Sequence, residues 1–215
     1  MTRDNQPRPA AILWDYDGTM LDTEPIWMSV EKRMVADAGG SWSDEQAKAA
    51  IGISADETSR RLIAAIGDST ISIADMNQRR FELVSQAVSA MPLPWRPGAE
   101  ALLNTAHNVG LPMAVVSTSP ASVIAAGLKR MPLDWFQVVI SGDDVEHHKP
   151  APDSYLLAAQ NLGVTIADCL VIEDSPSGCQ AALAAGAGLL AVPSQTELKP
   201  LPGMILRHSL ESLTM

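Results

Sequence analysis

Three aspartates stand close together directly after the first apolar segment of the chain. The stretch AILWDYDGTMLDTEP, residues 11–25, begins with apolar side chains and then places Asp15, Asp17 and Asp22 near Gly18. A short apolar run bounded by turn residues is typical of a strand buried on both faces of a parallel sheet. Asp15 would then lie at the carboxyl end of that strand, where open α/β sheets bind their ligands. Taken alone, the segment favours a plain turn, because Asp-Gly is a common turn dipeptide.

Polar residues follow three further apolar segments in the same way. They are Ser117-Thr118-Ser119 after MAVV, a loop leading to Lys149 after QVVI, and Glu173-Asp174-Ser175 after LVI. In a parallel sheet the carboxyl ends of the strands share one edge, so all four sets would meet there. That edge would hold carboxylates, hydroxyls and one lysine, which suits a metal ion and a phosphate group.

Residues of these types can transfer a phosphoryl group. The carboxylate of Asp15 could attack phosphorus and form an aspartyl phosphate. Asp17 could protonate the leaving alkoxide and later deprotonate the attacking water. Because phosphate esters and carboxylates repel each other, a divalent cation and a lysine are needed to neutralise the charge. Oxygen ligands from Asp15, Asp174 and a backbone carbonyl, with waters completing an octahedron, suit Mg²⁺.

The elements that must position these residues alternate along most of the chain. Six segments resemble buried strands: AILW, LPMAVVST, FQVVISGDD, DCLVIEDS, GLLAVP and the weaker GMILRHS. Helical patterns lie between them, and those at residues 98–110 and 152–163 both close on glycine, a usual helix stop. The alternation predicts an α/β fold with a doubly wound, Rossmann-like parallel sheet.

Residues 23–91 differ because they contain several helix starts and no convincing strand. Ser43-x-x-Gln46 and Ser54-x-x-Glu57 match capping boxes, and a further helix is predicted to begin near Ile73. The segment PLPWRPG, residues 92–98, reads as a stiff return linker. We therefore expect a core domain of residues 1–22 and 92–215, with an all-helical cap domain of residues 23–91 inserted after the first strand.

The motifs together resemble those of the haloacid dehalogenase-like superfamily. They are Asp15-x-Asp17-Gly18-Thr19, Ser117, Lys149 before Pro-x-Pro-Asp, and Glu173-Asp174 before Ser-x-x-Gly. Within it the chain looks like the helical-cap hydrolases, the group of β-phosphoglucomutases and small sugar-phosphate phosphatases. The resemblance implies a Mg²⁺ site made by Asp15, the carbonyl of Asp17, Asp174 and Glu173. It also implies that Gly18, Ser117, the amide of Thr118 and Lys149 contact the phosphoryl group.

Composition limits the classes of partner. The formal net charge of −10 leaves no basic field for nucleic acid or an anionic membrane. No apolar stretch reaches transmembrane length, the N-terminus lacks the apolar core of a signal peptide, and two cysteines make no disulfide framework. We expect a cytoplasmic monomer that acts on a small phosphorylated metabolite, with neither nucleic acid nor membrane as a partner. The neighbouring His147 and His148 are interpreted as loop residues.

Three functions compete at this stage. The first is a Mg²⁺-dependent phosphomonoesterase acting on a sugar, polyol or glycolate phosphate. The second is a phosphosugar mutase of the β-phosphoglucomutase type, and the third is a catalytically silent binding or regulatory protein on the same fold. Resemblance favours hydrolysis, because the places where those mutases carry a histidine and a cap arginine hold Trp27 and Ala55. Arg60, Arg61, Arg79 and Arg80 remain as cap arginines that could face a substrate.

Overall fold

A six-stranded parallel sheet forms the framework of the protein. The computed structural model describes residues 8–132, 134–211 and 213. Its strands are β1 (Ala11–Trp14), β2 (Met113–Val116), β3 (Val138–Ile140), β4 (Cys169–Glu173), β5 (Gly188–Ala191) and β6 (Met204–Leu206). They are arranged in the order β3-β2-β1-β4-β5-β6, and every neighbouring pair is parallel. All six segments predicted as strands are therefore strands of one sheet.

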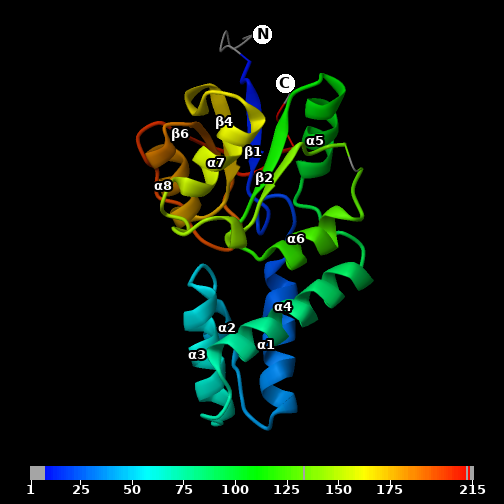
Figure 1. The fold of residues 1–215 in the computed structure, drawn as a ribbon, viewed down its shortest axis with the longest axis vertical. Coiled ribbons are helices and arrows are strands. Elements are labelled where there is room, and N and C mark those ends of the chain that lie inside the picture. The colour runs from blue at the N-terminus through cyan, green and yellow to red at the C-terminus, as the bar shows by residue number, and fades with distance from the viewer. Residues whose placement is uncertain (1–7, 133, 212, 214–215) are drawn as a thin grey trace. The chain divides into compact units, whose positions relative to one another are not determined.

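The strand order reverses at β1, which is where such sheets bind ligands. The chain runs outward from β1 to β2 and β3, then returns to place β4 on the other side of β1 (Figure 1). Trp14 pairs with Val115 on one side and with Ile172 on the other. The residues that follow these three strands are consequently level with one another at the carboxyl edge of the sheet.

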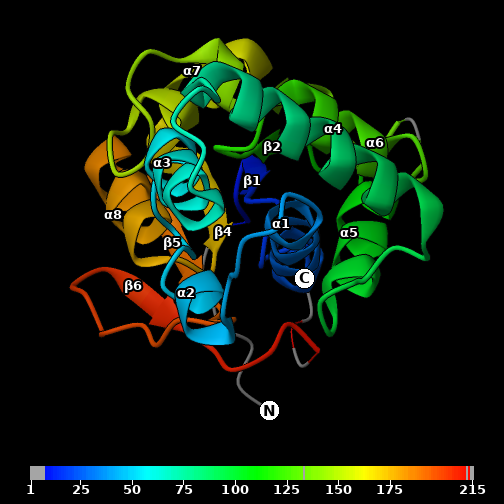
Figure 2. The same ribbon diagram turned by 90° about the horizontal axis from the view of Figure 1, so that it is seen from below.

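Helices cover both faces of the sheet. The helices that pack on the sheet are α5 (Ala99–Asn108), α7 (Asp153–Leu162) and α8 (Pro176–Ala185). Short 3₁₀ turns, η1 (Gly142–Asp144) and η2 (Ile166–Asp168), lie between the strands and helices. Helices α7 and α8 lie on one face and α5 lies on the opposite face (Figure 2). Leu13, Val116 and Val171 pack with Tyr155 of α7 and Cys179 of α8 in a buried apolar cluster. The predicted doubly wound α/β class is confirmed.

A helical insertion follows β1. It contains α1 (Glu24–Asp37), α2 (Asp44–Lys48), α3 (Ala55–Ile66) and α4 (Ile73–Ala90). Ser43 and Gln46 form the predicted reciprocal capping box at α2. The Ser54 hydroxyl accepts the Glu57 amide at the start of α3, which satisfies one free amide of its first turn. Helix α4 begins at Ile73, as the sequence predicts.

The chain divides into two compact units. One contains residues 1–21, 95–119 and 133–215, and the other contains residues 22–94 and 120–132. The second unit therefore includes α6 (Ala121–Leu128), a helix that the sequence assigns to the core domain. Val123 and Ala126 of α6 pack with Ile26 of α1 and with Val84 and Val88 of α4, which explains this grouping. We call the two units the sheet unit and the helical unit.

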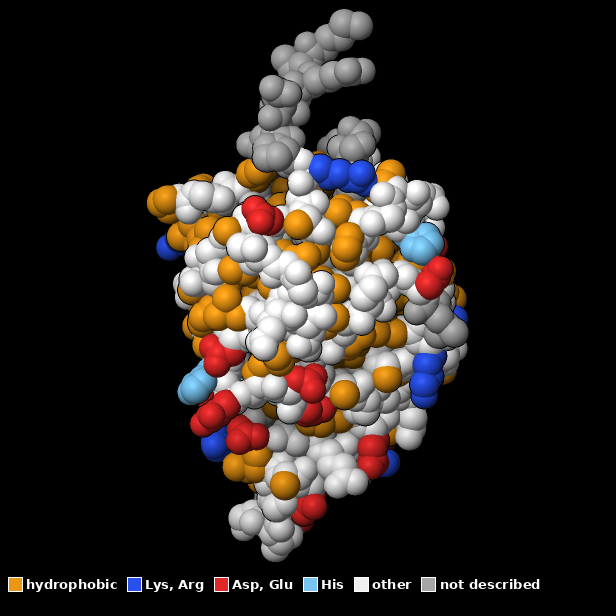
Figure 3. All heavy atoms as spheres, turned by 45° about the horizontal axis from the view of Figure 1, so that its top comes forward, with side chains coloured by type: hydrophobic (Ala, Val, Ile, Leu, Met, Phe, Trp, Pro, Cys, Tyr) orange, Lys and Arg blue, Asp and Glu red, His pale blue; other side chains and the backbone are white. Residues whose placement is uncertain are grey.

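No described helix combines the length and the apolar character needed to cross a membrane. The expectation that a signal peptide is absent concerns an N-terminal segment of which residues 1–7 lie outside the described part of the chain. On the face shown in Figure 3, acidic and basic side chains are scattered among apolar and neutral ones. Over the described residues of that face, the basic side chains form no continuous patch.

Candidate active site

Lys149 joins the first and fourth strands at the carboxyl edge of the sheet. Its ammonium donates to Asp15 Oδ1 at 2.6 Å, to Glu173 Oε1 at 2.8 Å and to the Val116 carbonyl at 3.0 Å. Its side chain is only 4% exposed, so the two ion pairs are shielded from solvent. The lysine thus contacts the ends of three neighbouring strands, β1, β2 and β4.

The electrostatics of this cluster are those of buried, interacting charges. Burial alone would lower the pKa of Lys149, but the carboxylates of Asp15 and Glu173 outweigh it and hold that pKa well above its usual value. Burial raises the pKa of Asp15, and the neighbouring charge of Glu173 raises it further. Asp15 and Glu173 contact the ammonium and Asp174 lies beside these two carboxyl groups, so the cluster has three carboxyl groups for one lysine and a formal excess of negative charge.

The excess charge is placed where a cation could be bound. Ligand atoms of Asp15, Glu173 and Asp174 all lie within 4.8 Å of one another. Asp15 Oδ2 is buried and has no hydrogen-bond partner, and a carboxylate oxygen left in that state is costly. Hard divalent cations prefer carboxylate oxygens, so the donor set and the partnerless oxygen fit a Mg²⁺ ion.

Both oxygens of Glu173 accept several hydrogen bonds. Its Oε1 accepts the Lys149 ammonium and the Tyr155 hydroxyl, the latter at 3.0 Å. Its Oε2 accepts the amides of Asp174 and Ser175, at 2.8 and 2.9 Å, and the Ser175 hydroxyl at 3.0 Å. A Cβ atom on Gly178 of α8 would overlap this carboxylate, so the glycine leaves the space that Glu173 occupies.

Asp174 is oriented by hydroxyl groups from two other segments. Thr19 Oγ1 donates to its Oδ1 at 3.1 Å, and the Ser194 hydroxyl donates to its Oδ2. Thr19 belongs to the turn after β1, and Ser194 follows β5. The side chain is only 4% exposed, so its position is fixed by neighbours rather than by solvent.

Asp17 lies at the same edge, where two serine hydroxyls donate to it. Its Oδ2 accepts Ser119 Oγ at 2.6 Å and Ser117 Oγ at 3.1 Å. A serine or threonine after a strand most often caps the next helix, so one of the hydroxyl residues before Pro120 is expected to cap α6, and this expectation is wrong. Pro120 itself is the N-cap of α6, and it makes no side-chain cap hydrogen bond.

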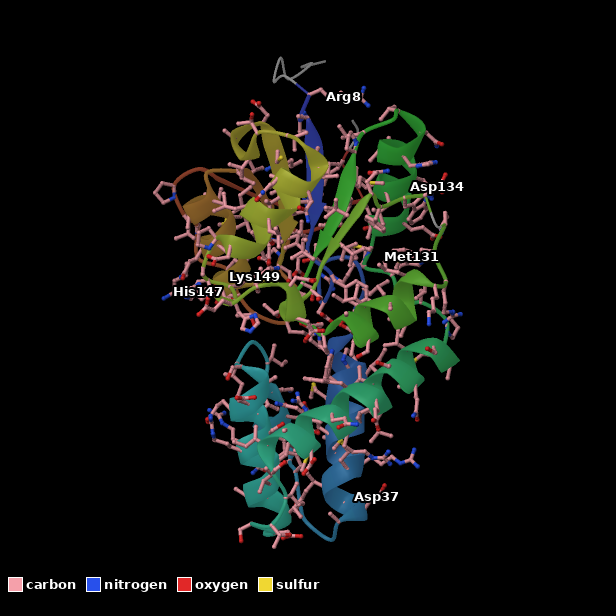
Figure 4. The ribbon with its side chains drawn as sticks, in the orientation of Figure 1. Arg8, Asp37, Met131, Asp134, His147 and Lys149 are labelled. Atoms are coloured by element: carbon pink, nitrogen blue, oxygen red, sulfur yellow. The ribbon has the colours of Figure 1, made fainter. Side chains whose placement is uncertain are left out.

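The turn after β1 and the loop after β2 contain the remaining residues predicted for the site, Gly18 and Thr118. The amide of Gly18 donates to the Leu21 carbonyl at 2.7 Å, and its φ of 83° lets the chain turn after β1. Thr118 is exposed beside Ser117. His147 lies at the periphery with a side chain that is 67% exposed, whereas Lys149 lies inside the sheet unit (Figure 4). His147 is therefore a loop residue, as predicted.

Sequence reasoning missed three polar neighbours of the cluster. Tyr155 belongs to an apolar face of α7, so its type and spacing indicated only core packing. Ser194 follows β5, and aligning the end of that strand with the others would have found it. Ser119 was visible at the end of β2, but the sequence indicated only that one of the three hydroxyl residues there caps the next helix.

Comparison with known proteins agrees with this geometry. The family described as haloacid dehalogenase-like hydrolase matches residues 12–192, which is most of the chain. The chain thus has the sheet and the strand-end carboxylates of a phosphoryl-transfer hydrolase fold. It belongs to the haloacid dehalogenase-like hydrolase family, as the motifs predict.

Several relatives in this family are named for what they hydrolyse. Fructose-1-phosphate phosphatase YqaB of Escherichia coli is 34% identical over 182 residues, covering 83% of this chain and 94% of that protein. Hexitol phosphatase A of Escherichia coli is 31% identical over 217 residues, covering 97% and 94%. The crystal structure of CbbY from Rhodobacter sphaeroides in complex with phosphate superposes with a TM-score of 0.85 at 26% identity, covering 95% and 96%.

Proposed function

We propose that the protein is a Mg²⁺-dependent phosphomonoester hydrolase acting on a small phosphorylated metabolite, a sugar, polyol or glycolate phosphate. The observation that carries this proposal is the state of Asp15. One of its oxygens is held by Lys149, while the other is buried without a hydrogen-bond partner beside Asp174. A carboxylate fixed at one oxygen and unsatisfied at the other is suited to both metal ligation and attack on phosphorus.

Asp15 and Asp17 would share the chemistry in two steps. A carboxylate oxygen of Asp15 attacks phosphorus, the bond from phosphorus to the ester oxygen breaks, and Asp17 gives its proton to the departing alkoxide. In the second step Asp17 takes a proton from water as the water oxygen attacks phosphorus. The bond between phosphorus and Asp15 then breaks, which releases inorganic phosphate and restores the Asp15 carboxylate.

The other residues would neutralise and orient the reacting groups. Lys149 balances the charge of Asp15 and of the phosphoryl oxygens, and Ser117 with the Thr118 amide donates hydrogen bonds to those oxygens. Gly18 allows the turn that brings Asp17 back to the edge of the sheet. Mg²⁺, held by Asp15, the Asp17 carbonyl and Asp174, supplies charge neutralisation for the transferred group when it is bound.

Glu173 is assigned to this site in a supporting role. Its two oxygens already accept five hydrogen bonds, from Lys149, Tyr155, the Asp174 amide, and the Ser175 amide and hydroxyl. A carboxylate engaged to that extent has little capacity left for direct ligation. We therefore propose that Glu173 mainly orients Lys149 and remains next to the metal site.

Hydrolysis is favoured over mutase chemistry by the four cap arginines that the sequence analysis names. A mutase must grip the phosphate that it does not transfer, and each of these four arginines is paired with a carboxylate. The nitrogen–oxygen distances are 3.3 Å for Arg60–Glu57, 3.0 Å for Arg61–Glu57, 3.8 Å for Arg79–Glu82 and 2.8 Å for Arg80–Glu31. Trp27 packs edge-to-face on Phe81, with ring centroids 6.2 Å apart, and offers no charge for a phosphate.

The substrate class follows from the relatives named for fructose 1-phosphate and for hexitols. We propose a cytoplasmic enzyme that works as a monomer on such a metabolite and needs neither nucleic acid nor membrane. The chemistry proposed for the site does not depend on these assignments. It requires only that a phosphate monoester reaches Asp15.

A phosphate-release assay tests the proposal. Sugar, polyol and glycolate phosphates are offered to the purified protein with Mg²⁺, with excess chelator, and with chelator followed by Mg²⁺. We expect release from at least one substrate, loss of release on chelation and recovery with Mg²⁺. Ca²⁺ should inhibit, because its larger and looser ligand shell disturbs in-line geometry. Full activity in excess chelator would contradict the metal site, and no release from any substrate would contradict the hydrolase.

A further inference from the structure

Two serine hydroxyls converge on a single oxygen of Asp17. Ser119 Oγ lies 2.6 Å from Asp17 Oδ2, and Ser117 Oγ lies 3.1 Å from the same atom. The shorter of the two bonds comes from the residue to which the phosphoryl-binding role is not assigned. Hydrogen bonds from hydroxyl to carboxylate at this distance are charge-assisted and stronger than neutral ones.

The backbone holds Ser119 in a defined place for this bond. Its amide donates to Ser117 Oγ at 2.9 Å, and its carbonyl accepts the Gly142 amide at 2.9 Å. A Cβ atom on Gly142 would collide with the Thr118 carbonyl, so the glycine permits the loops after β2 and β3 to approach closely. Ser119 is thus anchored from both sides by the ends of two strands.

From this arrangement we infer that Ser119 is a positioning residue for Asp17, the proposed acid and base. Ser117 has two competing duties, because the proposed function also asks it to donate to phosphoryl oxygens. When Ser117 turns to the substrate, Ser119 is the hydroxyl that still holds Asp17 Oδ2. A group that transfers protons must keep its geometry through both steps, and Ser119 supplies this.

The other roles open to Ser119 explain the geometry less well. It does not cap α6, whose N-cap is Pro120 without a side-chain cap. A merely structural hydroxyl would bond the backbone, as Thr105 does by donating to the Ala101 carbonyl at 2.8 Å. The hydroxyl of Ser119 instead reaches a side chain about a hundred positions away in the sequence, within the edge that carries the proposed chemistry.

The test compares two leaving groups, and it rests on the proposed function. An alkyl phosphate needs a proton from Asp17 when its bond breaks, whereas p-nitrophenyl phosphate releases a stable anion that needs none. We expect Ser119→Ala to lower kcat for the alkyl phosphate about tenfold or more. The first-turnover burst of p-nitrophenol should change less than about twofold, and KM for both substrates should stay near the wild-type value.

Two matched variants sharpen the result. Ser119→Thr keeps the hydroxyl and should restore most of kcat for the alkyl phosphate. Ser154→Ala removes another buried serine hydroxyl of the sheet unit, one without a hydrogen-bond partner, and should leave both reactions unchanged.

Equal losses for both leaving groups, or a rise in KM without a change in kcat, would overturn the positioning role and make Ser119 a binding or structural residue. Unchanged kinetics in Ser119→Ala would overturn it as well. Failure of the proposed function is distinguishable from these outcomes, because the wild-type protein would then hydrolyse neither substrate.

Discussion

Among the residues that the structure describes, ionic groups are buried in two places, and the two differ in charge balance. In the sheet unit, Asp15, Glu173 and Asp174 form a cluster with one lysine, which pairs with Asp15 and Glu173, and Asp15 Oδ2 has no hydrogen-bond partner. In the helical unit, Glu31 of α1 pairs with Arg80 of α4, so the two charges cancel. We call these groups the site cluster and the helical cluster.

The helical cluster is also satisfied in its hydrogen bonds. Arg80 Nε and Nη2 donate to Glu31 Oε1 at 3.2 and 2.8 Å. Its Nη1 donates to the Ala55 carbonyl at 3.3 Å, to Asn77 Oδ1 at 3.2 Å and to Ser59 Oγ at 3.4 Å. Its guanidinium carbon also lies 5.4 Å from the centroid of the Trp27 ring. The cluster joins α1, α3 and α4, and each nitrogen of Arg80 has a hydrogen-bond partner within it.

The difference indicates that the site cluster can bind a ligand, whereas the helical cluster stabilises the fold. Charge that is balanced by a hydrogen-bonded partner gains little from a further ligand. Charge that is in excess, with a partnerless oxygen, is stabilised when a cation binds. We therefore expect changes in the site cluster to remove activity while sparing stability, and changes in the helical cluster to remove stability.

The largest expected effect belongs to Asp15. Asp15→Asn removes the nucleophile, because an amide does not attack phosphorus, so kcat should fall by at least about three orders of magnitude. Folding stability should stay within about 1 kcal/mol of wild type, since the change removes a charge that is buried and in excess. Steady-state phosphate release and urea unfolding measure the two quantities.

Asp168→Asn is the matched control for Asp15→Asn. Asp168 is exposed and directly precedes β4, at the opposite end of the sheet from the site. This variant should keep both activity and stability. If Asp15→Asn retained more than a few per cent of activity, or if it unfolded the protein, the assignment of the site cluster would be contradicted.

In the helical cluster we expect the reverse pattern, a loss of folding stability rather than of activity. Arg80→Met leaves Glu31 buried without its counter-charge, which should cost about 3–5 kcal/mol of unfolding free energy at neutral pH. The double variant Arg80→Met/Glu31→Leu should recover most of that loss, because both charges are then gone. Arg79→Met serves as control, since Arg79 is an exposed neighbour in the same helix.

The pH dependence of this loss has a definite sign. Burial already raises the pKa of Glu31 in the wild type, against the lowering effect of Arg80. A carboxyl with a raised folded-state pKa contributes stability at low pH that is lost as the pH rises through that pKa. Without Arg80 the pKa rises further, so the deficit of Arg80→Met should shrink on acidification. A deficit that is independent of pH, or no deficit at all, would contradict the balanced-pair interpretation.

The sheet and its strand ends could be predicted because they depend on local patterns. Each strand is a short apolar run, and the proposed chemical residues lie directly after the run or in the following loop. Parallel pairing then brings Asp15, Ser117 and Glu173 to one edge without further information. The sequence pattern placed Lys149 only in the loop after the third strand. Its role was inferred from the resemblance of the surrounding motif to the family.

The parts that could not be predicted depend on contacts between distant segments. Tyr155 is an ordinary apolar-face residue of α7 until its hydroxyl is placed 3.0 Å from Glu173. Helix α6 follows the second strand in sequence, yet its apolar side chains pack with α1 and α4. The ion pair between Arg80 and Glu31 could not be predicted either, because the two residues are 49 positions apart in the sequence.

The most direct test of the account is to trap the phosphoryl group on Asp15. Asp17→Asn protein is mixed with p-nitrophenyl phosphate and Mg²⁺, quenched in acid, digested and analysed by mass spectrometry. This substrate needs no proton for the first step, while the second step lacks its base, so phosphorylated enzyme should accumulate. The account predicts a peptide with Asp15 that is heavier by one phosphoryl group, absent from Asp15→Asn/Asp17→Asn. A phosphoryl group on any other residue, or rapid steady-state turnover by Asp17→Asn on an alkyl phosphate, would contradict it.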